Sequence, residues 1–205
     1  MNYNAKQLNL ALVSAADAEW RKNIKDFDAG QEATPEEIGK YFRNTGWQWF
    51  LDQYSNGTYT ERWRQQPWQS YCGLFVAYCG LHVGRHVADD QCAAVALKRH
   101  VASAVLPSTV KLADRSRWKT QPKRPGLIEL QPGDIATVGD YKGGAGSHIV
   151  LVVSRPSNKE VETIEGNATG RFPDGTTGEG VIRRTRKLDE IHATYRLKWK
   201  HYTNG

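Results

Sequence analysis

The sequence predicts an α+β fold, in which N-terminal helices pack against an antiparallel sheet of C-terminal strands. Apolar residues between 8 and 27 recur at three- and four-residue steps, the spacing of one face of a helix. From about residue 134 onward, apolar runs of strand length alternate with turn residues. The order of elements is therefore helices first and strands afterwards.

Two amphipathic helices are expected before residue 55. The first ends near Gly30. The second begins at Thr34, which is expected to be the N-cap, with Pro35 in the first turn and Glu37 completing a capping box. This second helix should run toward Tyr54, with a break near Gly46.

Two more helices follow the turn at Ser55-Asn56-Gly57. One covers residues 71–79 and is stopped by Gly80. The next is capped by Asp89-Asp90 and carries an apolar face as far as Val105. Residues 107–133 are polar and contain four prolines, so we expect a long surface connection there.

Strands are expected beyond this connection. The run Ile149–Val153 is apolar throughout, which is typical of a central strand covered on both faces. The expected strands lie at about 134–138, 147–154, 160–166, 179–186 and 193–200.

Composition narrows the function classes. The formal net charge of +6 favours an anionic partner, but acidic and basic residues are mixed along the chain, so nucleic acid is not expected. No apolar run is long enough to span a membrane. Residues 8–13 are too few, and too interrupted by Asn9, for the apolar core of a signal peptide, so we expect synthesis in the cytoplasm without one.

Three cysteines, an odd number without framework spacing, argue against a disulfide scaffold, and no Cys/His pairs stand at metal-ligand spacing. We expect no metal and no cofactor. Cys72 is the candidate nucleophile, because it lies in the first turn of its helix, where the dipole favours a thiolate. Cys79 is expected at the negative end of that helix as a buried apolar residue, and Cys92 lies beside two aspartates that oppose ionisation.

His148 opens the apolar strand and is the candidate base. A tight hairpin centred on Ser157-Asn158 would place His148 opposite Asn167 and Val150 opposite Glu165. His148, Glu165 and Asn167 would then share one face of the sheet. Glu165 or Asn167 could hold the imidazole in the required tautomer.

The oxyanion donor is open at this point. The backbone N–H of Cys72 is the natural first donor, and Gln66 or Gln69 could add a side-chain amide. Trp68 and Tyr71 could line the cleft or belong to the core. Asp134, in a turn before a strand, is expected to be a turn or cap residue rather than a catalytic one.

Four segments together resemble a CHAP domain, the cysteine- and histidine-dependent amidohydrolase/peptidase family, which belongs with NlpC-type enzymes in the papain-like superfamily. The resemblance covers roughly residues 60–170. It rests on Ser70-Tyr71-Cys72-Gly73-Leu74-Phe75-Val76, Gln131-Pro132-Gly133-Asp134-Ile135, Gly146-Ser147-His148-Ile149 and Ile164-Glu165-Gly166-Asn167, in that order.

The resemblance implies a papain-like fold with the nucleophile on a helix packed against the sheet, Cys72 as nucleophile, His148 as base, and Glu165 orienting it with help from Asn167. It departs at Tyr71, where the family often has Gln, which leaves the oxyanion donor undecided. Residues 1–58 match nothing in the family, so we expect them to form a helical extension to a CHAP-like catalytic domain at 59–205, with both parts in one compact unit.

CHAP domains commonly cleave peptidoglycan peptides as endopeptidases or amidases, so the resemblance implies a peptidoglycan peptide as substrate. Without a signal peptide, we expect delivery to the periplasm or cell wall of a target bacterium as a type VI secretion effector, with a secretion-system component and an immunity protein as partners. A phage endolysin, a protease or deamidase toxin acting on host proteins, and a non-catalytic binding module are the alternatives.

Overall fold

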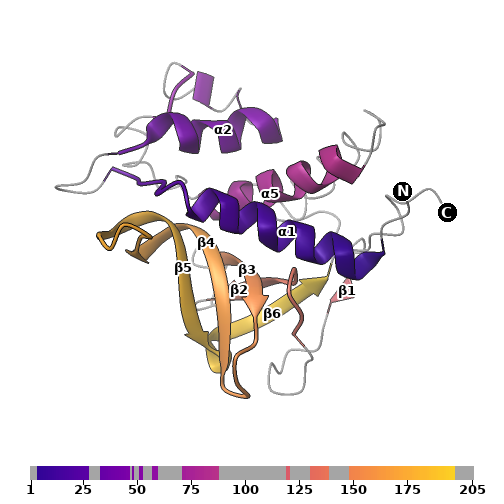
Figure 1. The fold of residues 1–205 in the computed structure, drawn as a ribbon. Helices are drawn as coiled ribbons and strands as arrows, with labels where there is room; N and C mark the ends of the chain where they lie inside the picture. Colours follow the sequence, from indigo (N-terminus) through magenta and orange to yellow (C-terminus); the bar gives the residue numbers. More distant parts are fainter. Residues whose placement is uncertain are drawn as a thin grey trace.

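The computed structural model confirms the α+β class (Figure 1). Helices α1 (Ala5–Trp20), α2 (Pro35–Thr45) and α5 (Cys72–Val87) lie together on one side of an antiparallel sheet. The structure describes residues 4–27, 33–46, 48, 51–52, 57–59, 71–87, 119–120, 130–138 and 148–196. The predicted helix after Asp89-Asp90 lies outside these residues.

The sheet has the strand order β1-β6-β2-β3-β4-β5, with antiparallel pairing throughout. Its strands are β1 (Lys119–Thr120), β2 (Ile135–Val138), β3 (His148–Ser154), β4 (Glu160–Arg171), β5 (Thr177–Lys187) and β6 (Ile191–Arg196), with a short 3-10 helix, η3 (Leu188–Glu190), before β6. Within the predicted surface connection, residues 119–120 form β1 at the edge of the sheet.

Both faces of β3 are buried, as its apolar run predicts. Ile149, Leu151 and Val153 belong to a core shared with α1, α2 and α5. Val150 and Val152 point to the opposite face, into a second cluster that includes Leu188 and Ile191. Described residues on both sides of position 58 belong to the first core, among them Phe42 before it and Phe75 after it.

Helix α1 is shorter than predicted. It ends at Trp20, and Ile24, although buried, lies outside it. The chain then runs extended beside β5, where the Val181 N–H donates to the Ile24 carbonyl at 3.0 Å and the Asp26 N–H to the Glu179 carbonyl at 2.7 Å. Pairing with the sheet edge has overridden the helical periodicity of the sequence.

The start of α2 differs from the predicted capping box. Thr34 is the N-cap residue, as predicted, but its hydroxyl bonds the backbone of Lys25 instead of the helix, accepting from the N–H at 2.8 Å and donating to the carbonyl at 3.1 Å. Pro35 occupies the first turn as predicted. The predicted break at Gly46 is confirmed, since Gly46 has a φ of 87°, which glycine adopts without strain.

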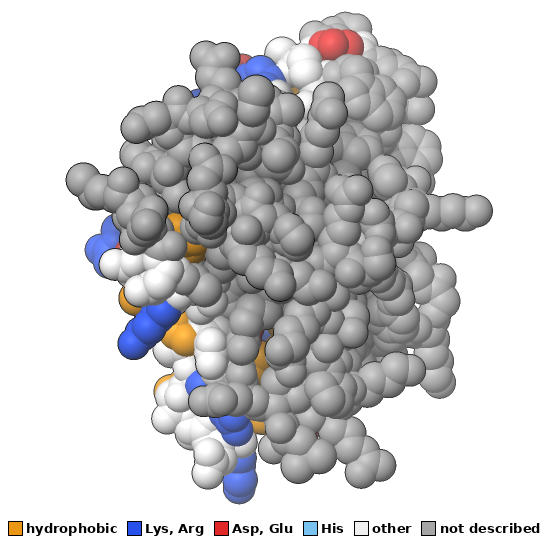
Figure 2. Space-filling model, turned by 90° about the vertical axis from the view of Figure 1, so that its right-hand side faces the viewer, with side chains coloured by type: hydrophobic (Ala, Val, Ile, Leu, Met, Phe, Trp, Pro, Cys, Tyr) orange, Lys and Arg blue, Asp and Glu red, His pale blue; other side chains and the backbone are white. Residues whose placement is uncertain are grey.

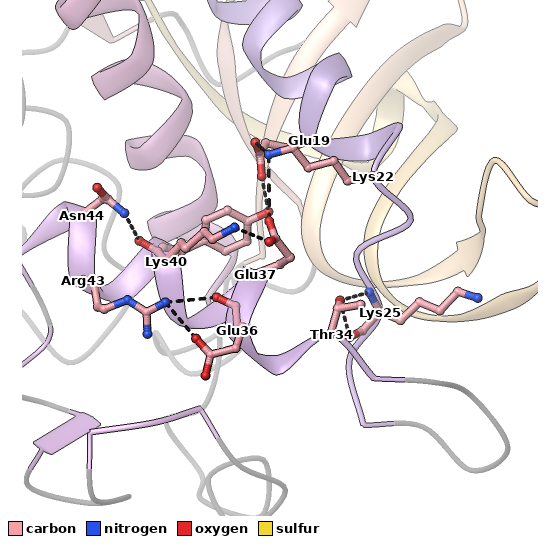
Figure 3. Close-up of polar contacts among 10 residues, drawn as sticks. Glu19, Lys22, Lys25, Thr34, Glu36, Glu37, Lys40, Arg43 and Asn44 are labelled. Carbon is pink, nitrogen blue, oxygen red and sulfur yellow. Dashed lines mark hydrogen bonds and ion pairs between the residues drawn. The ribbon is translucent and has the colours of Figure 1, made fainter.

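A buried carboxylate joins α1 to α2 (Figure 3). Glu19 accepts hydrogen bonds from Lys22 Nζ at 2.5 Å and from the hydroxyl of Tyr41 at 3.1 Å. Lys22 also lies 3.9 Å from Glu37, which pairs with Lys40. A buried charge is tolerated when it is paired and hydrogen-bonded, so this cluster fixes how α2 sits on the end of α1.

Ion pairs occupy many of the described basic side chains. Arg183 bonds both Asp17 and Glu162 at 2.8 Å, and Lys25 bonds Asp174 at the same distance. On the face drawn in Figure 2, described Lys and Arg side chains lie along one margin beside hydrophobic ones. Part of the described basic charge is therefore balanced locally by neighbouring carboxylates.

The start of α5 packs directly on β4 at Gly166. A Cβ at this position would lie 2.6 Å from Phe75 Cβ and 3.2 Å from Tyr71 Cε2. We predict that Gly166→Ala lowers the free energy of unfolding by roughly 1–3 kcal/mol, because the helix must move away from the strand. Urea denaturation of the purified protein measures this loss.

Gly39→Ala in α2 is the matched control for that substitution. The three atoms nearest to its Cβ all belong to the guanidinium end of Arg43, the closest at 3.0 Å, and this end of a long side chain can shift to make room. This variant should keep or slightly increase the free energy of unfolding, because alanine favours helix. Equal free energies for Gly166→Ala and wild type would contradict the close approach of α5 and β4.

Candidate active site

Cys72 is the first residue of α5, as its predicted chemistry requires. The first helical hydrogen bond runs from the Phe75 N–H to the Tyr71 carbonyl at 2.8 Å. Cys72 therefore lies where unpaired backbone N–H groups and the helix dipole stabilise negative charge. Its side chain is fully buried.

His148 is the first residue of β3, and its imidazole bridges two groups. Nε2 lies 3.0 Å from Glu165 Oε2. The imidazole also makes a side-chain hydrogen bond with Cys72. Because Nε2 is used by Glu165, Nδ1 is the ring nitrogen available to the sulfur. The structure thus brings Cys72, His148 and Glu165 together in the predicted order.

The surroundings of His148 favour its protonated form. Burial acts to lower the pKa, but hydrogen bonds and negative charge from Cys72 and Glu165 outweigh it and raise the pKa of His148 to about 9. An imidazole with this pKa carries a proton at neutral pH. The arrangement is therefore suited to a thiolate–imidazolium pair.

Glu165 is a fully buried carboxylate with four donors. Oε1 accepts from Thr163 Oγ1 and from Arg186 Nε, each at 2.5 Å. Oε2 accepts from His148 Nε2 at 3.0 Å and from Arg186 Nη2 at 2.7 Å. A carboxylate offers about four lone-pair positions, so this group is saturated.

The same contacts keep Glu165 ionised. Burial acts to raise its pKa, but hydrogen bonds and positive charge from Arg186 and His148 prevail and lower the pKa to about 2. Glu165 thus remains an acceptor for the His148 N–H over the whole range in which a protein functions. It can orient the imidazole without taking up the proton itself.

Arg186 is the site residue that sequence analysis missed. It lies in the run Arg183-Arg184-Thr185-Arg186 of β5, a pattern typical of a solvated strand face. Its partner on β4 is Val161, whereas Glu165 is opposite Ile182. The side chain must therefore reach along the strand to bond Glu165. Nothing in the spacing of the sequence indicates that contact.

The predicted register between β3 and β4 is confirmed at two pairs, Leu151 with Ile164 and Val152 with Thr163. An irregularity follows between Val152 and Ser154, near the turn. The predicted tight hairpin at Ser157-Asn158 is replaced by a longer connection over residues 155–159, and the shift beside it restores the predicted register farther along the strands. That register sets His148 near Glu165.

Asn167 lies in a bulge of β4, where the pairing with β5 shifts between Glu165 and Ala168. Its φ is 59°, a left-handed conformation that asparagine tolerates better than most residues. The extra residue of the bulge interrupts the alternation on which its predicted position depends. The carboxylate of Glu165, rather than the amide of Asn167, is bonded to His148 Nε2.

Tyr71 lies in the aromatic core. Its ring centroid is 5.9 Å from that of Tyr41 and 6.0 Å from that of Tyr59, and the residue is fully buried. Of the two places proposed for it, cleft wall or core, the structure assigns the core. The other candidates for the oxyanion site, Gln66, Trp68 and Gln69, lie outside the described residues.

Cys79 is buried, as predicted, but for a different reason. Helix α5 continues past Gly80 to Val87, so Cys79 lies in mid-helix rather than at its negative end. Burial, followed by the charge of Glu19, raises the pKa of the Cys79 thiol well above its ordinary value. A buried, protonated thiol is unreactive.

Asp134 is a turn residue, as predicted. Its carboxylate accepts from the Gln131 N–H at 2.9 Å, and its own N–H donates to the Gln131 carbonyl at 3.0 Å. Gly133 and Asp134 also exchange backbone bonds with Val152 at 2.9 and 2.8 Å. The turn therefore aligns β2 with β3, the strand that carries His148.

No group of three or more His, Cys, Asp and Glu side chains arranged to hold a metal ion occurs among the residues that the structure describes. In the same parts of the chain, every helix is too short or too polar to cross a membrane.

Comparison with protein-family models, with curated proteins and with solved structures gave no match.

The contact between Glu165 and His148 can be tested by titration. We predict that Glu165→Gln lowers the pKa of His148 from about 9 by roughly 1–3 units, because a nearby negative charge is removed and burial remains. NMR titration of the His148 imidazole measures the change, with the exposed Glu160→Gln on the same strand as control. An unchanged pKa in Glu165→Gln would contradict the contact.

Proposed function

We propose that this protein is a cysteine amide hydrolase of the CHAP type, with a papain-like arrangement of helix and sheet. One observation carries the proposal: the His148 imidazole is bonded to Glu165 through Nε2 and to the side chain of Cys72, at the start of a helix. A nucleophile, a base and an oriented acceptor for the base are the parts that acyl transfer to sulfur requires.

In the acylation step, His148 holds the proton of Cys72 and leaves a thiolate. The sulfur attacks the carbonyl carbon of the scissile amide, and the C=O electrons move to oxygen. When the tetrahedral intermediate collapses, the C–N bond breaks and His148 delivers its proton to the leaving amine. The products are a thioester at Cys72 and a free amine.

In the deacylation step, neutral His148 takes a proton from water as the water oxygen attacks the thioester carbonyl. The C–S bond then breaks, the carboxylic acid leaves, and the thiolate–imidazolium pair is restored. Glu165 stabilises the imidazolium in both steps and keeps its own negative charge throughout. The backbone N–H groups at the start of α5 are the proposed oxyanion donors.

The resemblance to CHAP domains makes peptidoglycan peptides the proposed substrate, and the net charge of +6 suits an anionic cell wall. Cys72 is fully buried, while the His148 side chain keeps 20% of its exposure. Substrate binding therefore requires the protein to open and expose the Cys72 sulfur. We propose that the protein reaches the cell wall as an antibacterial type VI secretion effector. The alternative is a phage endolysin that cleaves the same kind of amide bond.

Digestion of purified sacculi tests this function. Wild-type protein should release new muropeptides whose masses show addition of water at an amide, and Cys72→Ala should release none. Cys79→Ala, the same change two turns along the same helix, should retain activity, because Cys79 is a buried structural residue. Muropeptide chromatography with mass spectrometry gives the readout, and circular dichroism verifies that both variants fold.

Sacculi left intact by the wild-type protein would contradict peptidoglycan as the substrate. If a protein substrate were instead changed in a Cys72-dependent way, the chemistry would stand and the toxin alternative would replace the cell wall. Equal behaviour of wild type and Cys72→Ala on both kinds of substrate would favour a binding module.

The activity should fall on the basic side as His148 deprotonates. Because the raised pKa of His148 is about 9, kcat/KM should decline as the pH rises through that value, where no proton is left for the leaving amine. Initial rates on a soluble muropeptide, taken from about pH 5 to about pH 10, measure this decline in kcat/KM. A decline of kcat/KM centred near 6.5, the ordinary pKa of histidine, would contradict the pairing of His148 with Cys72.

A further inference from the structure

We propose that Arg186 is a positioning residue, which clamps both oxygens of Glu165 so that the carboxylate stays ionised and aimed at His148. This inference rests on the proposed function, because it assigns a role within the same site. Arg186 does not touch the sulfur or the reacting atoms. It acts through Glu165.

The geometry of the clamp is bidentate. Arg186 Nε bonds Glu165 Oε1 at 2.5 Å, and Nη2 bonds Oε2 at 2.7 Å. Two parallel bonds fix the plane of the carboxylate as well as its place. Since Oε2 also accepts from His148 Nε2 at 3.0 Å, fixing that plane fixes the direction of the imidazole.

Arg186 is itself held from the other side. Its third nitrogen, Nη1, bonds Glu190 Oε2 at 2.8 Å, and Glu190 Oε1 accepts from the Lys187 N–H at 3.1 Å. The guanidinium side chain keeps 12% exposure and Glu190 keeps 41%. A chain of contacts therefore runs from partly exposed η3 through Arg186 and Glu165 to His148.

The charged neighbours of Glu165 come from several elements. His148 faces it from β3 and Arg186 from β5, while Cys72 on α5 faces the imidazole and Glu190 on η3 faces the guanidinium. Only Arg186 brings a permanent positive charge to this group of described residues. Without Arg186, the buried Cys72 thiolate and the buried Glu165 carboxylate would share the His148 imidazolium as the single positive charge of this described group.

The consequence appears on the acid side. Glu165 has a pKa of about 2, so its contribution to stability and orientation is present above its ordinary value of 4.5 and is lost only as the pH falls toward 2. Removing Arg186 takes away two of its four hydrogen bonds and the neighbouring positive charge. The carboxylate should then take up a proton at a pH higher by roughly 1–3 units.

The test is an NMR titration of the His148 imidazole from about pH 3.5 to about pH 10, a range that includes the ordinary pKa values of Glu and His. It compares the full-length wild type with Arg186→Gln and Arg186→Lys. In wild type the His148 signals should show its own step near 9 and no further step down to the lowest pH. Arg186→Gln should add an acid step, as Glu165 protonates, and lose about tenfold or more in kcat/KM on a muropeptide.

Arg186→Lys keeps the charge but not the fork, so it should show no acid step and still lose activity. It also preserves a buried ion pair, which guards against failure of Arg186→Gln to fold. Arg171→Gln is the matched control, because this exposed arginine of β4 bonds the backbone of Gly175. Its titration and activity should equal those of wild type.

The outcomes separate the two proposals. A wild-type His148 that titrates near its ordinary 6.5 would overturn both the catalytic pair and the role of Arg186. A wild type that behaves as expected beside an Arg186→Gln with the same titration and the same kcat/KM would overturn the role of Arg186 alone. Equal loss of stability at every pH, with no acid step, would reduce Arg186 to a structural residue.

Discussion

A buried carboxylate at position 165 constrains the rest of the site. Removing an ionised group from water is costly unless its lone pairs are filled and its charge is balanced. Here Thr163, Arg186 and His148 meet that demand, so strands β3, β4 and β5 must hold one relative position. The orientation of the imidazole follows from this demand, because the contacts that stabilise the sheet also hold His148.

Close packing sets the sulfur against that base. Gly166, the residue after Glu165, lies under Phe75 and Tyr71 at the start of α5, so the first turn of the helix rests on the strand that carries the carboxylate. A helix start brings unpaired N–H groups and a positive dipole end. The electrostatics that favour a thiolate at Cys72 and an imidazolium at His148 therefore come from one seam between helix and sheet.

The fold class and the two-sided burial of β3 could be predicted, because they depend on local signals, namely an apolar run and the order of elements. The register between β3 and β4 was predicted from a tight hairpin, whereas the structure reaches it through a longer connection and a shift between Val152 and Ser154. The loss of the capping box at Thr34, the end of α1 and the length of α5 could not be predicted, because partners distant in sequence decide them. Lys25 takes the Thr34 hydroxyl, and β5 takes the chain at Ile24. Arg186 was missed for the same reason, since its reach along β5 is a property of the assembled sheet.

The central claim is that the Cys72 sulfur is paired with His148, and the pH dependence of alkylation tests it most directly. Iodoacetamide should modify Cys72 with a rate that is already near its plateau at pH values well below 8.5, the ordinary cysteine value. The shape of the profile is the readout, since burial slows the reaction at every pH, and peptide mapping assigns the modified residue. A Cys72 rate that rises only around pH 8.5, unchanged by His148→Ala, would contradict the account.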